Sequence, residues 1–234
     1  MIDDVRARLA RIRERIAGAA ERAGRAPDGI TLIAVSKTFE ATIVQQAVDA
    51  GVLHLGENRV QEAAAKAPLL RGDSISWHLI GHLQSNKAKL AVTTFDVIHT
   101  IDSVALAVKL DRVAGEISRT PSVLIQVDLA HEATKSGADE TEVPGIVEAL
   151  DRCGSLRFRG LMTLPPFFDS AEEARPYFRR LREMLDGLNA HRPLALKLTD
   201  LSMGMSHDFE AVIEEGATMV RVGTAIFGGR STVN

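Results

Sequence analysis

The sequence of 234 residues predicts an α/β fold: one (β/α)8 barrel with an extra helix at its amino terminus. Short apolar runs alternate with segments of helical spacing, and this alternation is typical of a parallel sheet covered by helices. The repeats fill about 200 residues, a length at which a single α/β barrel closes. Composition does not change along the chain, so we expect one domain over residues 1–234.

Residues 1–25 are expected to form an amphipathic helix packed on the barrel. Apolar side chains recur at steps of three and four residues from Ile2 to Ala23, which places them on one face. Arginines fill the other faces and could serve RNA or membrane binding. A charged outer face is the norm for surface helices, so we expect a solvated face with pairs inside the helix, such as those of Glu14. Pro27-Asp28-Gly29 ends the helix.

Apolar runs bounded by glycine, proline and polar residues are expected to form the strands. In chain order these are Thr31–Ser36, Val52–Leu55, Ser76–Ile80, Val97–Thr100, Ser122–Asp128, Phe158–Thr163, Ala195–Leu198 and Met219–Val222. The segments between them have apolar residues at helical spacing. The expected helices are Ala41–Ala50, Glu57–Leu70, Asn86–Val92, Ser103–Ser118, Glu142–Cys153, Ala171–Asn189 and Asp208–Glu215.

Composition and charge exclude several functional classes. Apolar residues make up 45% and charged residues 25%, which is the mixture of a folded protein. The 28 basic and 31 acidic residues give a net charge of −3, which argues against nucleic acid as a partner. Neither a membrane-spanning run nor the apolar part of a signal peptide is found, so we expect a cytoplasmic protein. The single cysteine, Cys153, excludes a disulfide framework and a cysteine-based zinc site.

The active site of such a barrel lies at the carboxyl ends of its strands, so polar residues after each strand are the candidates. Lys37 follows the first strand, and a lysine amine there can attack a carbonyl, although a snorkelling surface lysine is the alternative. Asn58 follows the second strand and offers a donor and an acceptor, unless it only caps a helix. His82 follows the third strand, and the lack of a ligand partner on its own element predicts no metal. Lys135 is the rival nucleophile.

Two loops near the carboxyl terminus predict a phosphate site. Ser202 begins a loop after the seventh strand, and Gly223 with Thr224 follows the eighth. Glycines and hydroxyls at a helix start expose N–H groups to an anion, and barrel phosphate sites commonly use these two loops. With a lysine, they indicate either pyridoxal 5′-phosphate (PLP) or a phosphosugar bound as in an aldolase. Arg221 can only donate, so it would either face the pyridine nitrogen of PLP or clamp a second anion.

Longer motifs cover nearly the whole chain. They are residues 34–38 (AVSKT), 56–62 (GENRVQE), 77–87 (WHLIGHLQSNK), 135–137 (KSG), 160–163 (GLMT), 201–206 (LSMGMS) with Asp208, and 216–228 (GATMVRVGTAIFG). Together they resemble the pyridoxal phosphate homeostasis proteins, a family of small cytoplasmic PLP-binding barrels. The departures are Arg59, where some relatives have tyrosine, and a local variant over residues 165–168, and neither affects the lysine or the phosphate loops.

This resemblance implies roles for individual residues. Lys37 would carry PLP as a Schiff base, Asn58 would lie beside the ring, and Arg221 would face the pyridine nitrogen. The loops after the last two strands would hold the phosphate, and two further side chains would lie in the pocket wall. The phosphate set is Ser202, Gly223 and Thr224, with Met203 and Gly204 in the same loop, and the wall set is Met162 and His82.

The family's barrel is similar to the N-terminal domain of alanine racemase, which also uses a lysine and an arginine on the pyridine nitrogen. That enzyme, however, needs a second base, a tyrosine from an additional C-terminal β-domain. Proton transfer on two faces requires two positioned bases. The only tyrosine, Tyr177, falls in the helix expected over Ala171–Asn189, and the chain is expected to stop after the barrel, at Asn234. We therefore expect a PLP carrier or buffer in vitamin B6 homeostasis, without classical turnover.

This carrier would pass PLP to apo PLP-dependent enzymes. We expect a monomer without a nucleic-acid or membrane partner. A weak amino-acid racemase, with His82 as its second base, is the alternative function.

Overall fold

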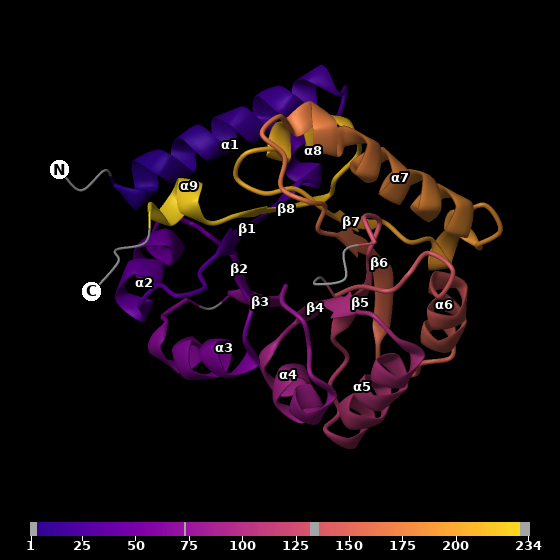
Figure 1. The fold of residues 1–234 in the computed structure, drawn as a ribbon. Helices are drawn as coiled ribbons and strands as arrows, with labels where there is room; N and C mark the ends of the chain where they lie inside the picture. Colours follow the sequence, from indigo (N-terminus) through magenta and orange to yellow (C-terminus); the bar gives the residue numbers. More distant parts are fainter. Residues whose placement is uncertain (1–3, 73, 132–135, 230–234) are drawn as a thin grey trace.

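The computed structural model of the protein describes residues 4–72, 74–131 and 136–229. Its described strands are all parallel and close into a barrel in sequence order, with β1 paired to both β2 and β8, which confirms the predicted fold class (Figure 1). The strands are β1 (Thr31–Val35), β2 (His54–Glu57), β3 (Ser76–Leu79), β4 (Val97–Ile101), β5 (Ser122–Val127), β6 (Arg157–Thr163), β7 (Asp200–Ser202) and β8 (Met219–Val222).

Helices surround the barrel on its outside (Figure 1). They are α1 (Val5–Arg22), α2 (Ala41–Asp49), α3 (Val60–Lys66), α4 (Ala88–Thr94), α5 (Val104–Glu116), α6 (Val143–Asp151), α7 (Ala171–Asn189), α8 (Phe209–Glu214) and α9 (Thr224–Phe227). Short 3₁₀ turns are η1 (Pro27–Gly29), η2 (Ala67–Leu69), η3 (Ser85–Lys87) and η4 (Leu194–Leu196). Within the described ranges, no helix is both long enough and apolar enough to cross a membrane.

Side chains alternate along each strand between the barrel interior and the surrounding helices. Leu55 and Ile98 are fully buried in the continuous apolar core between strands and helices. Ile33, Leu124 and Met162 are equally buried but stand apart from that core, inside the barrel. Apolar side chains therefore fill the layer between strands and helices, whereas the barrel interior also holds buried polar side chains such as His99 and Arg221.

Helix α1 packs against α8 and α9 on the outside of the barrel (Figure 1). Asp4 caps its first turn by accepting a hydrogen bond from the N–H of Arg6 at 3.0 Å. Its arginines make ion pairs across to α8, and these include Arg15 with Glu210 at 2.9 Å. The sequence suggested pairs within α1, whereas these pairs lie between helices, because α8 presents glutamates to the basic face of α1.

The seventh strand differs from the prediction. The segment expected as a strand, Ala195–Leu198, overlaps the turn η4, and the strand β7 begins at Asp200. Leu194 and Leu196 are 86% and 62% exposed, so this apolar run does not enter the barrel. The true strand starts with a charged residue, and the Arg159 side chain compensates it with an ion pair at 3.2 Å.

The second strand also lies further along the chain than expected. The prediction was Val52–Leu55 followed by a helix from Glu57, but β2 runs to Glu57 and α3 begins at Val60. Glu57 is fully buried at the end of the strand. A buried carboxylate there is tolerated because Lys66 of α3 pairs with it at 2.6 Å. Most other boundaries shift by one or two residues, while α7 and β8 match the prediction.

Candidate functional site

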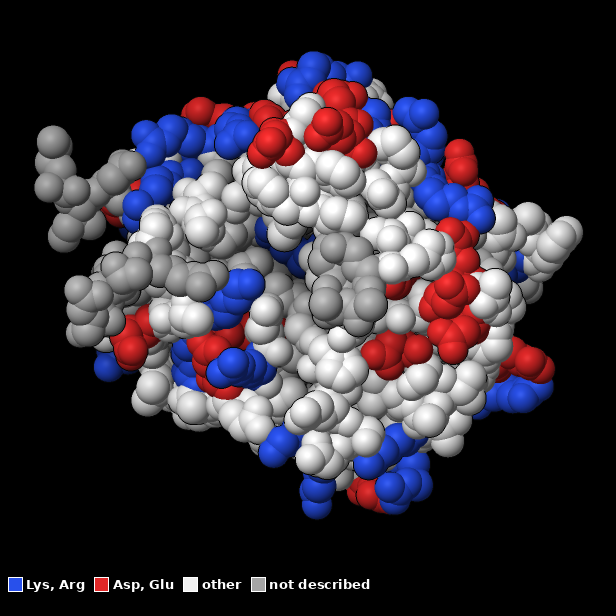
Figure 2. All heavy atoms as spheres, in the orientation of Figure 1, with Lys and Arg blue, Asp and Glu red and all other residues white. Residues whose placement is uncertain are grey.

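A cavity of about 310 Å³ opens at the carboxyl ends of the strands, beside β1, β2 and β8. The face in Figure 2 is hollowed near its centre, and Lys or Arg atoms are visible inside the hollow. This volume suits a small organic ligand. Five of the predicted residues line the cavity, namely Lys37, Asn58, Arg221, Gly223 and Thr224. The lining also includes residues that the sequence did not single out, namely Val35, Ile80, Leu164, Phe167, Met205, Ser206 and His207.

Lys37 follows β1, and a buried polar cluster holds the residue before it. The Ser36 hydroxyl donates to Oε1 of Glu57 at 2.7 Å. Nζ of Lys66 donates to the same carboxylate oxygen at 2.6 Å and to the carbonyl oxygen of Ser36 at 2.9 Å. Burial raises the pKa of Glu57, and the hydrogen bonds from Lys66 and Ser36 partly offset this rise. Hydrogen bonds therefore fix both the side chain and the carbonyl group of Ser36, the residue before Lys37.

The residue after Lys37 is held by helix α3, which also carries Lys66. The N–H of Thr38 donates to Oε1 of Glu62 at 2.5 Å, and Glu62 in turn lies 3.3 Å from Nζ of Lys66. Thr38 has a φ of 68°, in the left-handed region that a threonine rarely occupies. Backbone held in such a region persists only when its surroundings enforce it. The backbone on both sides of Lys37 is therefore held in place where this residue lines the cavity.

Asn58 lines the cavity where the loop after β3 comes very close to its backbone. A Cβ atom added to Gly81 would lie only 2.3 Å from the carbonyl oxygen of Asn58. Only glycine permits this approach. The loop after β3 therefore presses against the loop after β2 and sets the position of the Asn58 side chain.

Arg221 projects from β8 into the barrel at the base of the cavity and is 3% exposed. One guanidinium nitrogen, Nη1, donates to the Ser202 hydroxyl at 2.6 Å, and the other, Nη2, donates to the carbonyl oxygen of Thr163 at 2.9 Å. Burial lowers the pKa of Arg221 to about 10, and the charge of Asp208 opposes this effect. The guanidinium is therefore still charged at neutral pH and offers only donors to a ligand.

Hydroxyl groups and a helix start gather at another side of the cavity. The Ser206 hydroxyl accepts from the N–H of Gly223 at 3.4 Å and lies 3.4 Å from the Thr224 hydroxyl. Gly223 immediately precedes α9. The loop that carries Ser206 is closed by Asp208, which accepts from the N–H of Met205 at 2.5 Å. This arrangement can receive an anion.

Gly204 serves the packing of this loop. Its φ is 85°, and a Cβ atom there would lie 2.4 Å from Cγ2 of Val212 on α8. Ser206 was missed as a separate candidate, although it closes the serine–methionine–glycine motif that the sequence analysis quoted. The shift of β7 explains the omission, because it moves the loop start beyond Ser202.

Besides Gly204, four more of the predicted cofactor-site residues lie outside the cavity lining. Ser202 and Met162 are fully buried and face each other in register on β7 and β6. Met203 is fully buried in the apolar core. The His82 side chain is 51% exposed, pairs with Asp102 at 3.2 Å, and lines a neighbouring hollow that also contains Asn58. Lys135 lies outside the described residues.

The groups available for proton transfer are few. Tyr177 lies on α7 and stacks against Phe168 with ring centroids 5.8 Å apart, outside the cavity lining. His207 is at the cavity mouth, with Nε2 3.4 Å from Asp208 and its ring 4.9 Å from that of Phe167. In the part of the chain that is described, no three histidine, cysteine or carboxylate side chains gather as a metal site would require.

Comparison with known proteins agrees with this geometry. A family profile described as "Alanine racemase, N-terminal domain" matches residues 7–231. The Pyridoxal phosphate homeostasis protein of Aquifex aeolicus is 41% identical over 223 residues, covering 95% of this chain and 97% of that protein.

Solved structures extend this comparison. The structure of PipY from Synechococcus elongatus PCC7942, with PLP bound, is 43% identical and superposes with a TM-score of 0.80, covering 91% of this chain and all of PipY. Alanine racemase from Clostridium difficile, at 16% identity and a TM-score of 0.73, shares the fold over 99% of this chain and 57% of its own. The chain therefore belongs to the alanine racemase N-terminal domain family and, within it, to the pyridoxal phosphate homeostasis proteins.

Proposed function

We propose that the protein binds PLP through a reversible covalent bond to Lys37 and acts in intracellular PLP homeostasis, buffering the cofactor or delivering it. One observation carries the proposal: a lysine, a donor-only arginine and a hydroxyl-rich helix start converge on one cavity of about 310 Å³. PipY, 43% identical, has been solved with PLP bound, and the relative from Aquifex aeolicus carries the homeostasis name.

The donor set matches the chemical parts of PLP. Its phosphate needs hydrogen-bond donors, which Ser206, Thr224 and the backbone at the start of α9 offer. Its aldehyde condenses reversibly with a primary amine, so that the carbon forms a double bond to nitrogen and the carbonyl oxygen leaves as water. Lys37 presents such an amine to the cavity.

Arg221 restricts the chemistry that a bound PLP could support. Its guanidinium can only donate, so it would keep a pyridine nitrogen that faces it unprotonated. PLP enzymes that need a strong electron sink use an acidic partner at that nitrogen. The hydrogen bonds to Ser202 and Thr163 fix the arginine in place, so it is not free to turn away. These features disfavour reactions that need a protonated pyridine ring, and the choice between a carrier and a racemase rests on the second base.

Racemase activity is the competing function, since the fold is shared with alanine racemase. Racemisation requires a second base opposite the lysine. Among the described residues that line the cavity, His207 is the one besides Lys37 with a side chain able to serve as a base, and it is exposed at the mouth. An exposed histidine at 3.4 Å from Asp208 is a poorly enclosed base, which favours the carrier.

Delivery of PLP to apo PLP-dependent enzymes, a monomeric state and a cytoplasmic location complete the proposal. The single cysteine of the sequence fits a reducing compartment. Transfer is tested by mixing the PLP-loaded protein with an apo-enzyme across a dialysis membrane and in free solution. Delivery by contact predicts faster activation in free solution, whereas equal rates indicate simple release. Sedimentation velocity measures the oligomeric state.

Absorption spectroscopy tests the covalent site. The purified protein is incubated with PLP, its spectrum is recorded, and the adduct is reduced with borohydride and mapped by peptide mass spectrometry. We expect the pyridoxyl group on Lys37, and loss of the adduct in Lys37→Ala. Lys197→Ala, an exposed lysine at the other end of the barrel, is the matched control and should retain it.

Two results would contradict this assignment. An unchanged adduct in a folded Lys37→Ala variant would move it to another lysine, with Lys135 the first to map. Absence of an adduct in the folded wild-type protein, together with borohydride trapping of a sugar phosphate, would favour the aldolase alternative instead.

A further inference from the structure

Three histidines from neighbouring strands form a continuous hydrogen-bonded chain through the barrel interior. Nδ1 of His54 on β2 lies 3.0 Å from Nε2 of His78 on β3. Nδ1 of His78 lies 2.8 Å from Nε2 of His99 on β4. Nδ1 of His99 lies 2.9 Å from the Ser202 hydroxyl, which accepts from Arg221 at 2.6 Å. The chain thus ends on the arginine at the base of the cavity.

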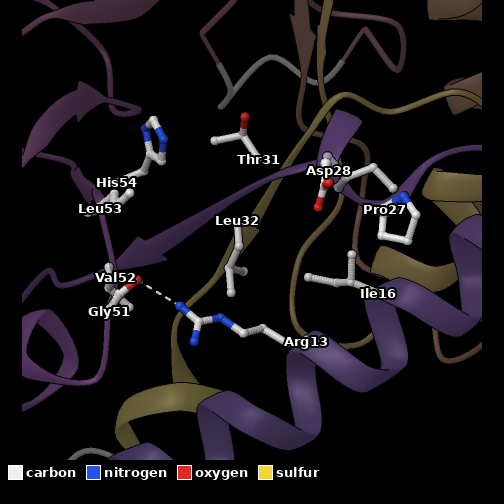
Figure 3. Close-up of a pocket in the computed structure, with 11 residues that line it drawn as sticks. Arg13, Ile16, Pro27, Asp28, Thr31, Leu32, Gly51, Val52, Leu53 and His54 are labelled. Carbon is white, nitrogen blue, oxygen red and sulfur yellow. Dashed lines mark hydrogen bonds between the residues drawn. The ribbon is translucent and has the colours of Figure 1, made fainter.

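The other end of the chain reaches the opposite mouth of the barrel. His54 is half-buried and lines a second cavity, of about 500 Å³, at the amino-terminal ends of β1 and β2. Figure 3 shows His54 across this cavity from Ile16 of α1, with Arg13 bonded to the carbonyl oxygen of Gly51 at 2.7 Å. The histidine chain therefore spans the barrel between its two mouths.

The interior members of the chain are uncharged. His78 and His99 are at most 1% exposed, and a charge on either would stand in the barrel interior near the charged Arg221. Burial, with a smaller contribution from His54, lowers the pKa of His78 to about 3. Burial also lowers the pKa of His99, and His78 and Arg221 add to this effect. Each interior ring therefore carries one proton, on one of its two nitrogens.

The charge on Arg221 decides which nitrogen that is. Arg221 and His99 are the hydrogen-bond partners of the Ser202 hydroxyl among the described residues. Because Arg221 can only donate, the Ser202 oxygen accepts from it, and the Ser202 proton needs an acceptor. Nδ1 of His99 is that acceptor, so His99 carries its proton on Nε2 and donates it to His78. His78 then donates from Nε2 to His54, and every bond in the chain points away from the arginine.

We propose that His99 is a positioning residue for Arg221: it fixes the Ser202 hydroxyl so that this oxygen presents its lone pairs to the guanidinium, and His78 and His54 hold His99 in the required tautomer. The effect of the chain on PLP rests on the proposed function, in which Arg221 faces the cofactor. The tautomers themselves do not depend on PLP.

A structural role in filling the barrel makes a different prediction from a positioning role. Leucine resembles histidine in size and suits an apolar interior, but it cannot accept a hydrogen bond from Ser202. Glutamine is polar, but its amide can accept from Ser202 and donate towards His78. If His99 only fills space, His99→Leu should bind PLP more tightly than His99→Gln. If His99 positions Arg221, His99→Gln should bind PLP more tightly than His99→Leu.

The first measurement uses the wild-type protein without cofactor. Its histidines are labelled with ¹⁵N, and the ring nitrogen shifts are recorded at neutral pH and assigned with His78→Gln and His99→Gln. We expect both interior histidines to be neutral and protonated on Nε2. A charged ring, or a proton on Nδ1 of His99, would overturn the inferred chain, whatever the protein binds.

The second measurement is the affinity for PLP, followed by the absorption of the lysine adduct. We expect His99→Leu to weaken PLP binding about 10- to 100-fold, which is the usual cost of losing one hydrogen bond to a charged group. His99→Gln should recover most of this affinity. Ser202→Ala should weaken PLP binding as much as His99→Leu does. The double variant should bind no more weakly than either single variant, because both changes remove the same hydrogen bond between Ser202 and His99.

Ile98→Val is the matched control, since Ile98 neighbours His99 on β4 but faces the helix layer. It should bind PLP as the wild type does. If a folded His99→Leu binds as tightly as the wild type, or more tightly than His99→Gln, His99 only fills space and the positioning role is wrong. If the wild type fails to bind PLP, the proposed function is wrong. The tautomer measurement then still tests the direction of the hydrogen bonds in the histidine chain.

Discussion

Nζ of Lys66 lies 2.6 Å from Oε1 of Glu57, in an ion pair buried directly behind the turn that carries Lys37. The side chains of Lys66 and Glu57 are 7% and 0% exposed. Through the Ser36 hydroxyl and carbonyl, this pair connects the end of β2 and helix α3 to the chain that enters Lys37. The turn that carries Lys37 is thus held by a charged cluster that contributes no group to the cavity lining.

Lys66→Met is expected to lower the free energy of unfolding by about 3–5 kcal/mol, because it leaves the Glu57 carboxylate buried without its partner. Urea denaturation at neutral pH measures this loss. The double variant Lys66→Met with Glu57→Gln should recover much of the stability, since no unpaired charge remains. A single variant as stable as the wild type would show that water reaches Glu57 in solution.

The pH dependence of this cluster has a defined sign. Burial raises the pKa of Glu57 in the folded protein, so the folded state holds its proton more firmly than the unfolded state does. The stability contributed by this titration is present below the ordinary pKa of a glutamate and is lost as pH rises through the raised value. The stability advantage of the wild type over Glu57→Gln should therefore shrink as the pH rises above the ordinary pKa of a glutamate. Urea unfolding at a series of pH values above that pKa checks it, and an advantage that grows with pH would contradict the raised pKa.

Gly81→Ala is expected to weaken PLP binding as well as stability. Its Cβ would lie 2.3 Å from the carbonyl oxygen of Asn58, so the loop after β2 must move and carry Asn58 with it. Titration with PLP, followed by absorption, measures the effect. Gly145→Ala on α6 is the control, because a Cβ there meets nothing within 4 Å. The control should bind normally and gain up to about 1 kcal/mol of stability from helix propensity.

Ser206→Ala separates recognition of the phosphate from recognition of the ring. The Ser206 hydroxyl stands beside Gly223 and Thr224, whereas the proposed function assigns Lys37 and Arg221 to the other parts of the ligand. We expect weaker binding of PLP by about tenfold, as for one hydrogen bond to a charged group, and unchanged binding of pyridoxal, which lacks the phosphate. Equal losses for both ligands would place the phosphate elsewhere.

Any turnover of amino acids should depend on His207 and not on Tyr177. His207 lines the cavity, while Tyr177 lies on α7 against Phe168. Racemisation of a panel of amino acids by the PLP-loaded protein is measured for His207→Ala and Tyr177→Phe. The carrier function predicts little activity in the wild type and no change in Tyr177→Phe. Robust wild-type turnover that disappears in Lys37→Ala would replace the carrier with an enzyme.

Local sequence patterns were sufficient to predict the fold class, the strand that delivers Lys37 and the last strand, β8. These strands are short apolar runs bounded by glycine and polar residues, so their burial follows from the pattern within one segment. The same patterns failed at β7, where an apolar segment at residues 194–196 is exposed and the strand begins with Asp200. The compensating charge, Arg159, lies on β6 and is distant in sequence.

The sequence by itself therefore determined which chemical groups the barrel mouth would offer: a lysine after β1, an arginine on β8 and hydroxyl-rich loops near the carboxyl terminus. Only the tertiary structure decided how they are supported. It turned Ser202 into the barrel and brought Ser206 to Gly223, it paired Glu57 with Lys66, and it aligned His54, His78 and His99. The physical reason is that side-chain alternation is a local property of each strand, whereas strand register and closure of the barrel bring together groups that lie tens of residues apart.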